Sequence, residues 1–217
     1  MIQVETFDST SYNPPSINES TAILFENFEG IVDGSLPTEF LHSGEVNDTA
    51  YVVYDPVTTQ SKSMFLHEHG GDKRNSIVKI ENIESGNMVI DFYYKVNGAN
   101  ASRQVFQLYN EEGLRCVGMN TLIGYYWRYR SPEETATGFG VWKAMPSLGK
   151  VEADKWYHIE IFTDYETQMV MYGVDGVYSE WLPSQSNWEV ITGISFRGNY
   201  NYPADAWYDE LQVSEYE

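Results

Sequence analysis

Short runs of alternating apolar and polar residues fill most of this chain. In the segment 155–163 (KWYHIEIFT), Tyr157, Ile159 and Ile161 alternate with polar neighbours such as His158. A spacing of two places the apolar side chains on one face of a β-strand and leaves the other face wet. The spacing of three and four that marks an amphipathic helix does not recur along the chain. The pattern therefore predicts an all-β protein.

Turn residues separate these runs. Gly70-Gly71, Asn97-Gly98 and Asp175-Gly176 are among the breaks, and Asp-Gly between two strand-like runs is a strong signal for a β-hairpin. Roughly thirteen strands at this spacing suit two stacked antiparallel sheets. No internal repeat of a propeller or solenoid is present. We predict a two-sheet antiparallel jelly-roll sandwich.

The first segment of the chain differs in composition from the rest. Residues 1–20 are rich in Ser, Thr, Asn and Pro, which is typical of a linker or N-terminal arm, although this segment is also able to add an edge strand. We expect residues 21–217 to form one sandwich domain, because a chain of 217 residues is a normal length for this architecture.

Charge and cysteine content exclude several classes of protein. A net charge of −19 argues against binding to nucleic acid. No apolar stretch is long enough to insert into a membrane. The single cysteine, Cys116, excludes an internal disulfide and is expected to be a buried small apolar residue. The chain begins without a signal-peptide pattern, so we expect it to be part of a larger multidomain protein.

Three segments resemble a known family. FENFEG (25–30) and AWYDELQV (206–213) resemble the opening and closing strands of concanavalin A-like, laminin-G-like jelly-roll domains, and DKWYHIEI (154–161) followed by VMYGVDGV (170–177) resembles one of their hairpins. Many such domains are appended to polysaccharide-degrading enzymes, and others are lectins, lyases, hydrolases or adhesion modules. The resemblance implies an extracellular or cell-surface location.

The same resemblance implies a structural Ca²⁺ site. Opening and closing strands of such domains often lie side by side, so an acid after the first strand and an acid in the last can share one cation. Glu29 and Asp209 match these positions, and carboxylate oxygens are the ligands that calcium prefers. The alternative is that both are ordinary solvated acids of an acidic protein.

The middle of the chain concentrates basic and aromatic residues. Residues 95–155 hold eight Lys and Arg against six Asp and Glu, whereas no Lys or Arg precedes Lys62. In a strand over IGYYWRYR (123–130), alternate residues share one face. The resulting prediction is a sugar-binding sheet face made of Arg103, Gln107, Tyr109, Tyr126, Arg128, Arg130 and Trp142.

These residue types suit a carbohydrate chain. Pyranose rings lie flat on aromatic rings, and Arg or Gln side chains bridge pairs of hydroxyls or a uronate carboxylate. The alternative is that the rings are core residues and the arginines are paired with surplus acids.

No catalytic motif is recognisable. His67 and His69 share one face of their run but lack a third metal ligand, and the paired-carboxylate motif of jelly-roll hydrolases is absent. We therefore expect an extracellular, non-catalytic carbohydrate-binding module. One alternative is a polysaccharide lyase acting on a uronate polymer, with a histidine such as His158 as base beside Arg and Tyr. Another is a structural or adhesive surface or filament subunit whose residues 1–20 donate a strand.

Overall fold

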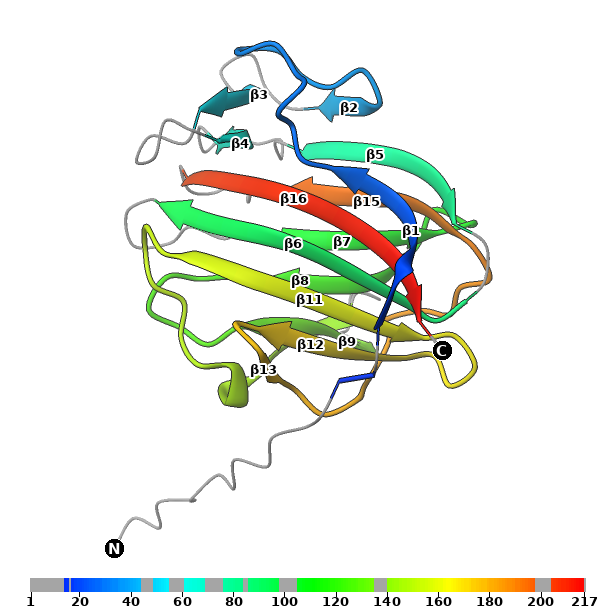
Figure 1. Ribbon diagram of the computed structural model, residues 1–217. Coiled ribbons are helices and arrows are strands. Elements are labelled where there is room, and N and C mark those ends of the chain that lie inside the picture. The colour runs from blue at the N-terminus through cyan, green and yellow to red at the C-terminus, as the bar shows by residue number, and fades with distance from the viewer. Residues whose placement is uncertain are drawn as a thin grey trace, which may run out of the picture.

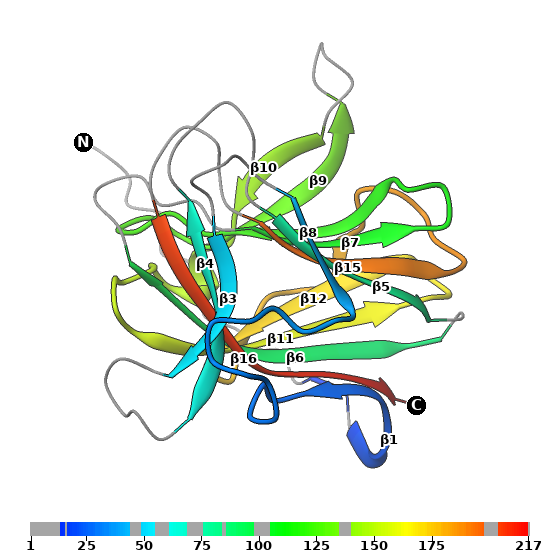
Figure 2. The same ribbon diagram turned by 90° about the horizontal axis from the view of Figure 1, so that it is seen from above.

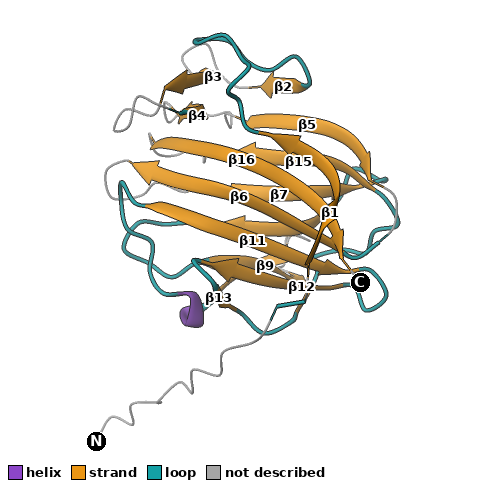
Figure 3. Ribbon diagram, viewed as in Figure 1, coloured by secondary structure: helices purple, strands orange, loops and turns teal. Residues whose placement is uncertain are grey.

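Strands make up almost all of the regular structure (Figure 3). The computed structural model describes residues 14–15, 17–43, 49–54, 61–68, 76–83, 86–97, 105–134, 140–197 and 204–216. Within these ranges the one helical element is a short 3-10 helix, η1 (Pro146–Leu148). The prediction of an all-β chain is confirmed.

The strands form two sheets, called sheet A and sheet B, that lie face to face (Figures 1 and 2). The main path of sheet A runs in the order β13 (Val177–Tyr178), β12 (Met169–Val174), β11 (Trp156–Asp164), β6 (Met88–Asn97), β16 (Ala204–Tyr216), β4 (Lys62–Glu68) and β3 (Thr49–Tyr54). Off this path, β1 (Ile17–Glu26) pairs with β16 and β14 (Leu182–Pro183) pairs with β12.

Sheet B lies behind sheet A in the first view (Figure 1). Its order is β10 (Gly140–Ala144), β9 (Arg128–Glu134), β8 (Arg115–Asn120), β7 (Val105–Asn110), β15 (Ile191–Arg197), β5 (Ser76–Ile83) and β2 (Phe40–Ser43). The strand pairs in both sheets are antiparallel. The predicted two-sheet antiparallel jelly-roll sandwich is confirmed.

The core lies between the two sheets. Phe92 of sheet A stacks on Phe106 of sheet B with ring centroids 5.1 Å apart, and Phe196 meets Phe92 edge-on at 5.6 Å. Aromatic pairs of this geometry stabilise a core beyond the burial of their area. Cys116 is fully buried in the same core, as predicted.

Local predictions hold where a strand or a turn is set by adjacent residues. In β11, Tyr157, Ile159 and Ile161 are buried in the core, whereas His158 lies half-exposed on the opposite face. Asp175-Gly176 joins β12 to β13, and both residues have positive φ, as a two-residue hairpin turn requires.

The opening and closing strands are neighbours. Phe25 of β1 is opposite Gln212 of β16, and Glu26 is opposite Leu211. β1 begins at Ile17, before the predicted start of the domain, and residues 1–13 and 16 lie outside the described ranges. Among the described residues, no helix has the length and apolar character needed to cross a membrane.

Candidate functional site on the outer face of sheet B

The outer face of sheet B carries polar side chains because its strands alternate. Phe106 and Leu108 of β7 point into the core, so Gln107 and Tyr109 point away from it. In β15, which pairs with β7, Phe196 is likewise buried, and the next residue faces outward. Neighbouring strands thus place their polar residues side by side.

Arg197 of β15 connects the outward side chains of β7. Its Nη1 donates hydrogen bonds to Oε1 of Gln107 at 3.1 Å and to the phenol oxygen of Tyr109 at 3.0 Å. The Tyr109 hydroxyl in turn donates to Oε1 of Gln107 at 2.8 Å. We call these three residues the Arg197 cluster. A cation, a phenol and an amide are held together in one network.

An aromatic ring lies farther across the same face. Trp142 of β10 is opposite Arg130 of β9, and the guanidinium carbon of Arg130 lies 5.0 Å from the centroid of the indole ring. This is a cation–π contact. Trp142 is half-buried, so part of its ring stays open to solvent.

Several outward-pointing polar residues of this face are buried. Gln107 is only 2 % exposed and Ser195 is 0 % exposed, although both point away from the core. The side-chain oxygens of Ser195 and Asn120, and Nε of Arg197, have no hydrogen-bond partner within the described part of the chain. Buried polar atoms are usually paired in native proteins. The face therefore carries buried polar groups rather than a second apolar core.

The face is also locally basic. Arg128, Arg130 and Arg197 all stand on it, in a protein whose net charge is −19. Lys143, at the edge strand, is paired with Glu133 instead. Guanidinium groups bind carboxylates in a fixed fork geometry, so this surface favours anionic groups over cations.

The structure brings together most of the predicted sugar-binding set. Gln107, Tyr109, Arg128, Arg130 and Trp142 share the outer face of sheet B. The predicted Arg103 lies outside the described residues.

Tyr126 is placed differently from the expected strand over 123–130. A turn with positive φ at Gly124 precedes it, and β9 starts only at Arg128. Tyr126 forms an isolated bridge with Lys150, whose ammonium lies 5.5 Å from the centre of its ring. Tyr126 is 40 % exposed and lies outside the alternation of β9.

Arg197 was not among the predicted residues. The signal was present in VITGISFRG (190–198), where this arginine alternates with the apolar Phe196. Only the pairing of β15 with β7 places it beside Tyr109.

Both predicted calcium ligands accept hydrogen bonds from backbone N–H groups. Oε1 of Glu29 accepts the N–H of Lys62 at 2.8 Å, and Oδ1 of Asp209 accepts the N–H of Glu210 at 2.8 Å. The Lys62 ammonium donates to the carbonyl oxygens of Glu29 and Ile31 at 3.2 and 2.6 Å. Calcium binding by Glu29 and Asp209 stays a prediction.

Neither the histidines considered as metal ligands nor the one considered as a base is found on this face in the described part of the chain. His67 contacts Asp205 at 2.6 Å, and His69 lies outside the described residues. His158 is on the outer face of sheet A, on the opposite side of the sandwich from Tyr109. The expected arrangement of His158 with an arginine and a tyrosine on one surface is therefore not formed with the Arg197 cluster.

The fold is that of concanavalin A-like jelly rolls. It is similar to a sialidase structure, with a TM-score of 0.68 at 13% identity over 90% of this chain, which spans 18% of that protein. An endo-beta-1,4-glucuronan lyase from the fungus Trichoderma reesei gives a TM-score of 0.62 at 13% identity over 90% of this chain and 96% of the lyase. The carbohydrate recognition domain of Emp47p gives 0.57 at 9% identity over 93% of this chain and 100% of that domain.

At these identities the similarity establishes the fold alone. No protein-family model matches the chain. No curated protein matches it either.

Proposed function

We propose that the outer face of sheet B binds a polysaccharide, and that the chain is a non-catalytic carbohydrate-binding module of a larger extracellular protein. The observation that carries the proposal is the half-buried Trp142 on the same sheet face as the Arg197 cluster. An apolar ring beside a few fixed polar groups is the usual composition of a site for a small polar molecule.

Each part of the face has a role in this proposal. The indole of Trp142 stacks on the C–H face of a pyranose ring, which buries apolar area of both partners. Arg130 and Arg128 bind hydroxyl or carboxylate oxygens of the same chain. Because Arg128 and Arg130 are positively charged, we expect polymers that contain uronate to bind more tightly than neutral glucans.

The names of the similar structures support a role with carbohydrates. They include a sialidase, a glucuronan lyase and a carbohydrate recognition domain. An appended module also agrees with the partial span of the sialidase, whose remaining length lies outside the similar region.

A glycan panel tests the proposal. The protein is run through gels that contain neutral glucans or uronate polymers, and affinity is measured from its retardation. We expect Trp142→Ala to weaken binding about tenfold or more, because aromatic anchors at the centre of a binding surface each contribute at least about 1.4 kcal/mol. The matched control is Trp156→Ala, a half-buried tryptophan on the outer face of sheet A.

Two results would contradict the proposal. One is the absence of binding to every polymer of the panel. The other is binding that survives Trp142→Ala and is lost in Trp156→Ala, which assigns the ligand to sheet A.

A uronate lyase is the second candidate, and the contact between Arg197 and Tyr109 favours it. In this reaction a base removes the proton beside the uronate carboxylate, a cation stabilises the carbanion, and the glycosidic C–O bond breaks to leave a double bond. The leaving oxygen takes up a proton. Tyr109 is the candidate proton carrier and Arg197 the candidate cation.

Ultraviolet absorbance of the unsaturated product separates the two candidates. We expect no increase on incubation with uronate polymers. An increase that Tyr109→Phe abolishes, while polymer retardation is unchanged, would replace the non-catalytic proposal with the lyase.

A further inference from the structure

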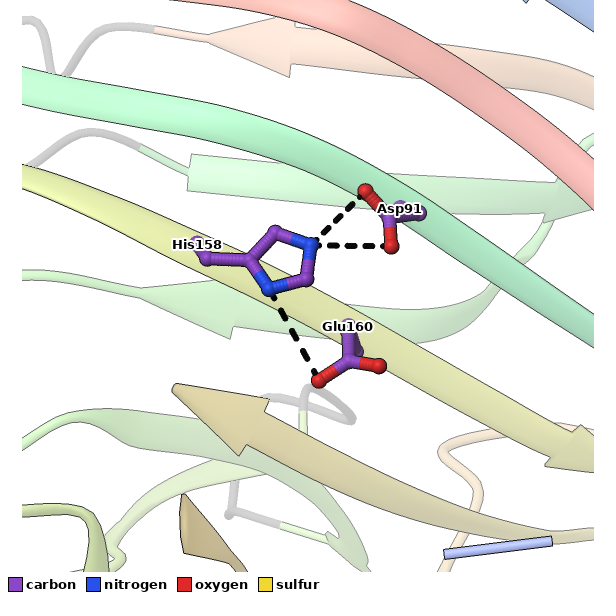
Figure 4. Close-up of side chains that lie close together, drawn as sticks. All are labelled: Asp91, His158 and Glu160. Carbon is purple, nitrogen blue, oxygen red and sulfur yellow. Dashed lines mark hydrogen bonds and ion pairs between the residues drawn. The ribbon is translucent and has the colours of Figure 1, made fainter. Parts of the chain in front are cut away.

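Three side chains of the types that can bind metal ions meet on the outer face of sheet A, away from the surface described above. Asp91 of β6 is directly opposite Glu160 of β11, and His158 is two residues before Glu160. Since Ile159 and Ile161 point into the core, their neighbours point outward together (Figure 4). One candidate ligand atom of each residue lies within 4.8 Å of the others.

The imidazole ring of His158 lies between the two carboxylates. Its Nε2 is 3.0 and 2.9 Å from the two carboxylate oxygens of Asp91, whereas its Nδ1 is 3.9 Å from Oε2 of Glu160 (Figure 4). A neutral imidazole that donates through Nε2 carries its lone pair on Nδ1. That lone pair then faces the oxygen of Glu160.

The gap between Nδ1 and Oε2 fits a cation better than a hydrogen bond. At 3.9 Å it exceeds the range of N–H···O bonds. A zinc ion bonded to a nitrogen and an oxygen at about 2.0–2.2 Å each holds the two atoms about 3.4 Å apart in tetrahedral geometry, so a small side-chain movement closes the gap onto the ion. Two groups that donate electron pairs repel one another across the gap unless a positive charge lies between them.

Neighbouring side chains hold both ligands in place. The hydroxyl of Tyr178 donates to Oε2 of Glu160 at 2.6 Å, and Glu160 is only 7 % exposed. The ring of Tyr93 stacks on His158 with centroids 5.0 Å apart. A metal ion therefore meets side chains whose rotamers are already restricted, which lowers the entropic cost of binding.

The surroundings are negatively charged. Burial together with the charges of Glu210, Asp91, Asp175 and Glu160 raises the pKa of Tyr93. Lys155 pairs with Asp175 at 3.0 Å at the border of the group. Carboxylates gathered in this way favour a divalent cation.

We propose that His158 and Glu160 bind a divalent transition-metal ion of the zinc class through Nδ1 and a carboxylate oxygen, with Asp91 as the positioning residue. Asp91 accepts a hydrogen bond from Nε2–H of His158. This bond fixes the tautomer and the orientation of the ring, which is how carboxylates commonly support metal-bound histidines. Water completes the coordination and leaves exchangeable positions. The site is independent of the proposed polysaccharide-binding face.

A proton is the competing occupant of the gap. The hydrogen bond to Asp91 raises the pKa of His158, and an imidazolium also places positive charge beside Glu160. Metal binding is therefore measured at several pH values up to mildly alkaline, because raising the pH removes the competing proton.

The test is calorimetric titration of the whole chain with Zn²⁺, Ni²⁺ and Mg²⁺. We expect one Zn²⁺ or Ni²⁺ per chain and no response to Mg²⁺, which prefers oxygen ligands. His158→Ala should abolish binding, and Asp91→Asn should weaken it about 10–100-fold. His67→Ala is the matched control, because it removes another carboxylate-paired histidine of sheet A.

Zinc affinity that is unchanged in His158→Ala, or an absence of binding in the unaltered protein, would overturn the site. Glu160 is buried, so Glu160→Gln is read together with a measurement that needs no substitution. Co²⁺ should broaden the ring resonances of His158 before those of His67 and His42 in nuclear magnetic resonance spectra. Equal broadening of all three, or none, contradicts the proposal.

Discussion

Gly118 lies beneath the indole of Trp142. A Cβ atom added to Gly118 would stand 3.5 Å from Cη2 of Trp142 and 3.3 Å from Cβ of Arg130. The missing side chain lets the ring lie close to the backbone of β8, which keeps the face of sheet B low at this point. The distance of the Trp142 indole from the sheet thus depends on Gly118, which need not contact the sugar.

Gly118→Val should raise the indole from the sheet and weaken polysaccharide binding about tenfold, since a displaced aromatic anchor loses its contacts. The overpacking should cost about 1–3 kcal/mol of unfolding free energy. Gel retardation and urea unfolding measure the two effects. Gly30→Ala is the control, because no atom lies within 4 Å of the added Cβ. Unchanged affinity in Gly118→Val would mean that the ring height is irrelevant.

Lys95 is predicted to stabilise sheet A. It is 3 % exposed, and its ammonium lies 4.6 Å from the ring centroids of both Trp156 and Trp207. Lys95→Ala should lower the free energy of unfolding by about 2–4 kcal/mol, because two cation–π contacts and the packing of the aliphatic stem are lost.

Urea unfolding measures this effect against Lys143→Ala. Lys143 pairs with Glu133 at the surface, and its side chain is 39 % exposed. An exposed pair of this kind contributes little to stability. Equal losses of unfolding free energy in the two variants would show that the contacts between Lys95 and the tryptophan rings do not stabilise the protein.

Cys116 should be chemically inert in the folded protein. Burial raises the pKa of its thiol to about 12, and the thiol donates to the carbonyl oxygen of Leu108 at 3.4 Å. A raised pKa leaves little reactive thiolate under mildly alkaline conditions. Alkylation in native buffer should be at least about 10²-fold slower than in urea, followed by mass spectrometry. Rapid labelling without denaturant would contradict the burial of Cys116.

Calcium should raise the melting temperature if Glu29 and Asp209 bind it. Binding only to the folded state stabilises the protein by about 2.7 kcal/mol when free calcium is 100 times the dissociation constant. Asp209→Asn should remove this effect, measured by thermal unfolding with calcium or a calcium-selective chelator. A melting temperature that does not change in excess chelator would contradict calcium binding here, where the Lys62 ammonium already bonds the carbonyl oxygens of Glu29 and Ile31.

The strands and tight turns could be predicted from the sequence because both depend on neighbouring residues. Alternation alone placed Tyr157 in the core and His158 outside it. The Asp175-Gly176 turn follows from the tolerance of these two residues for positive φ. Tyr126 shows the limit of this reasoning, since a turn at Gly124 interrupts an otherwise regular alternation.

By itself, the sequence determined that the chain forms strands and, in regular runs such as 157–161, which residues point into the core. Tertiary structure alone decided which outward residues meet. Arg197 reaches Tyr109 across 88 positions, and His158 reaches Asp91 across 67. The period of a strand is a local property of the backbone, whereas strand order and register depend on how the two sheets bury their apolar faces together.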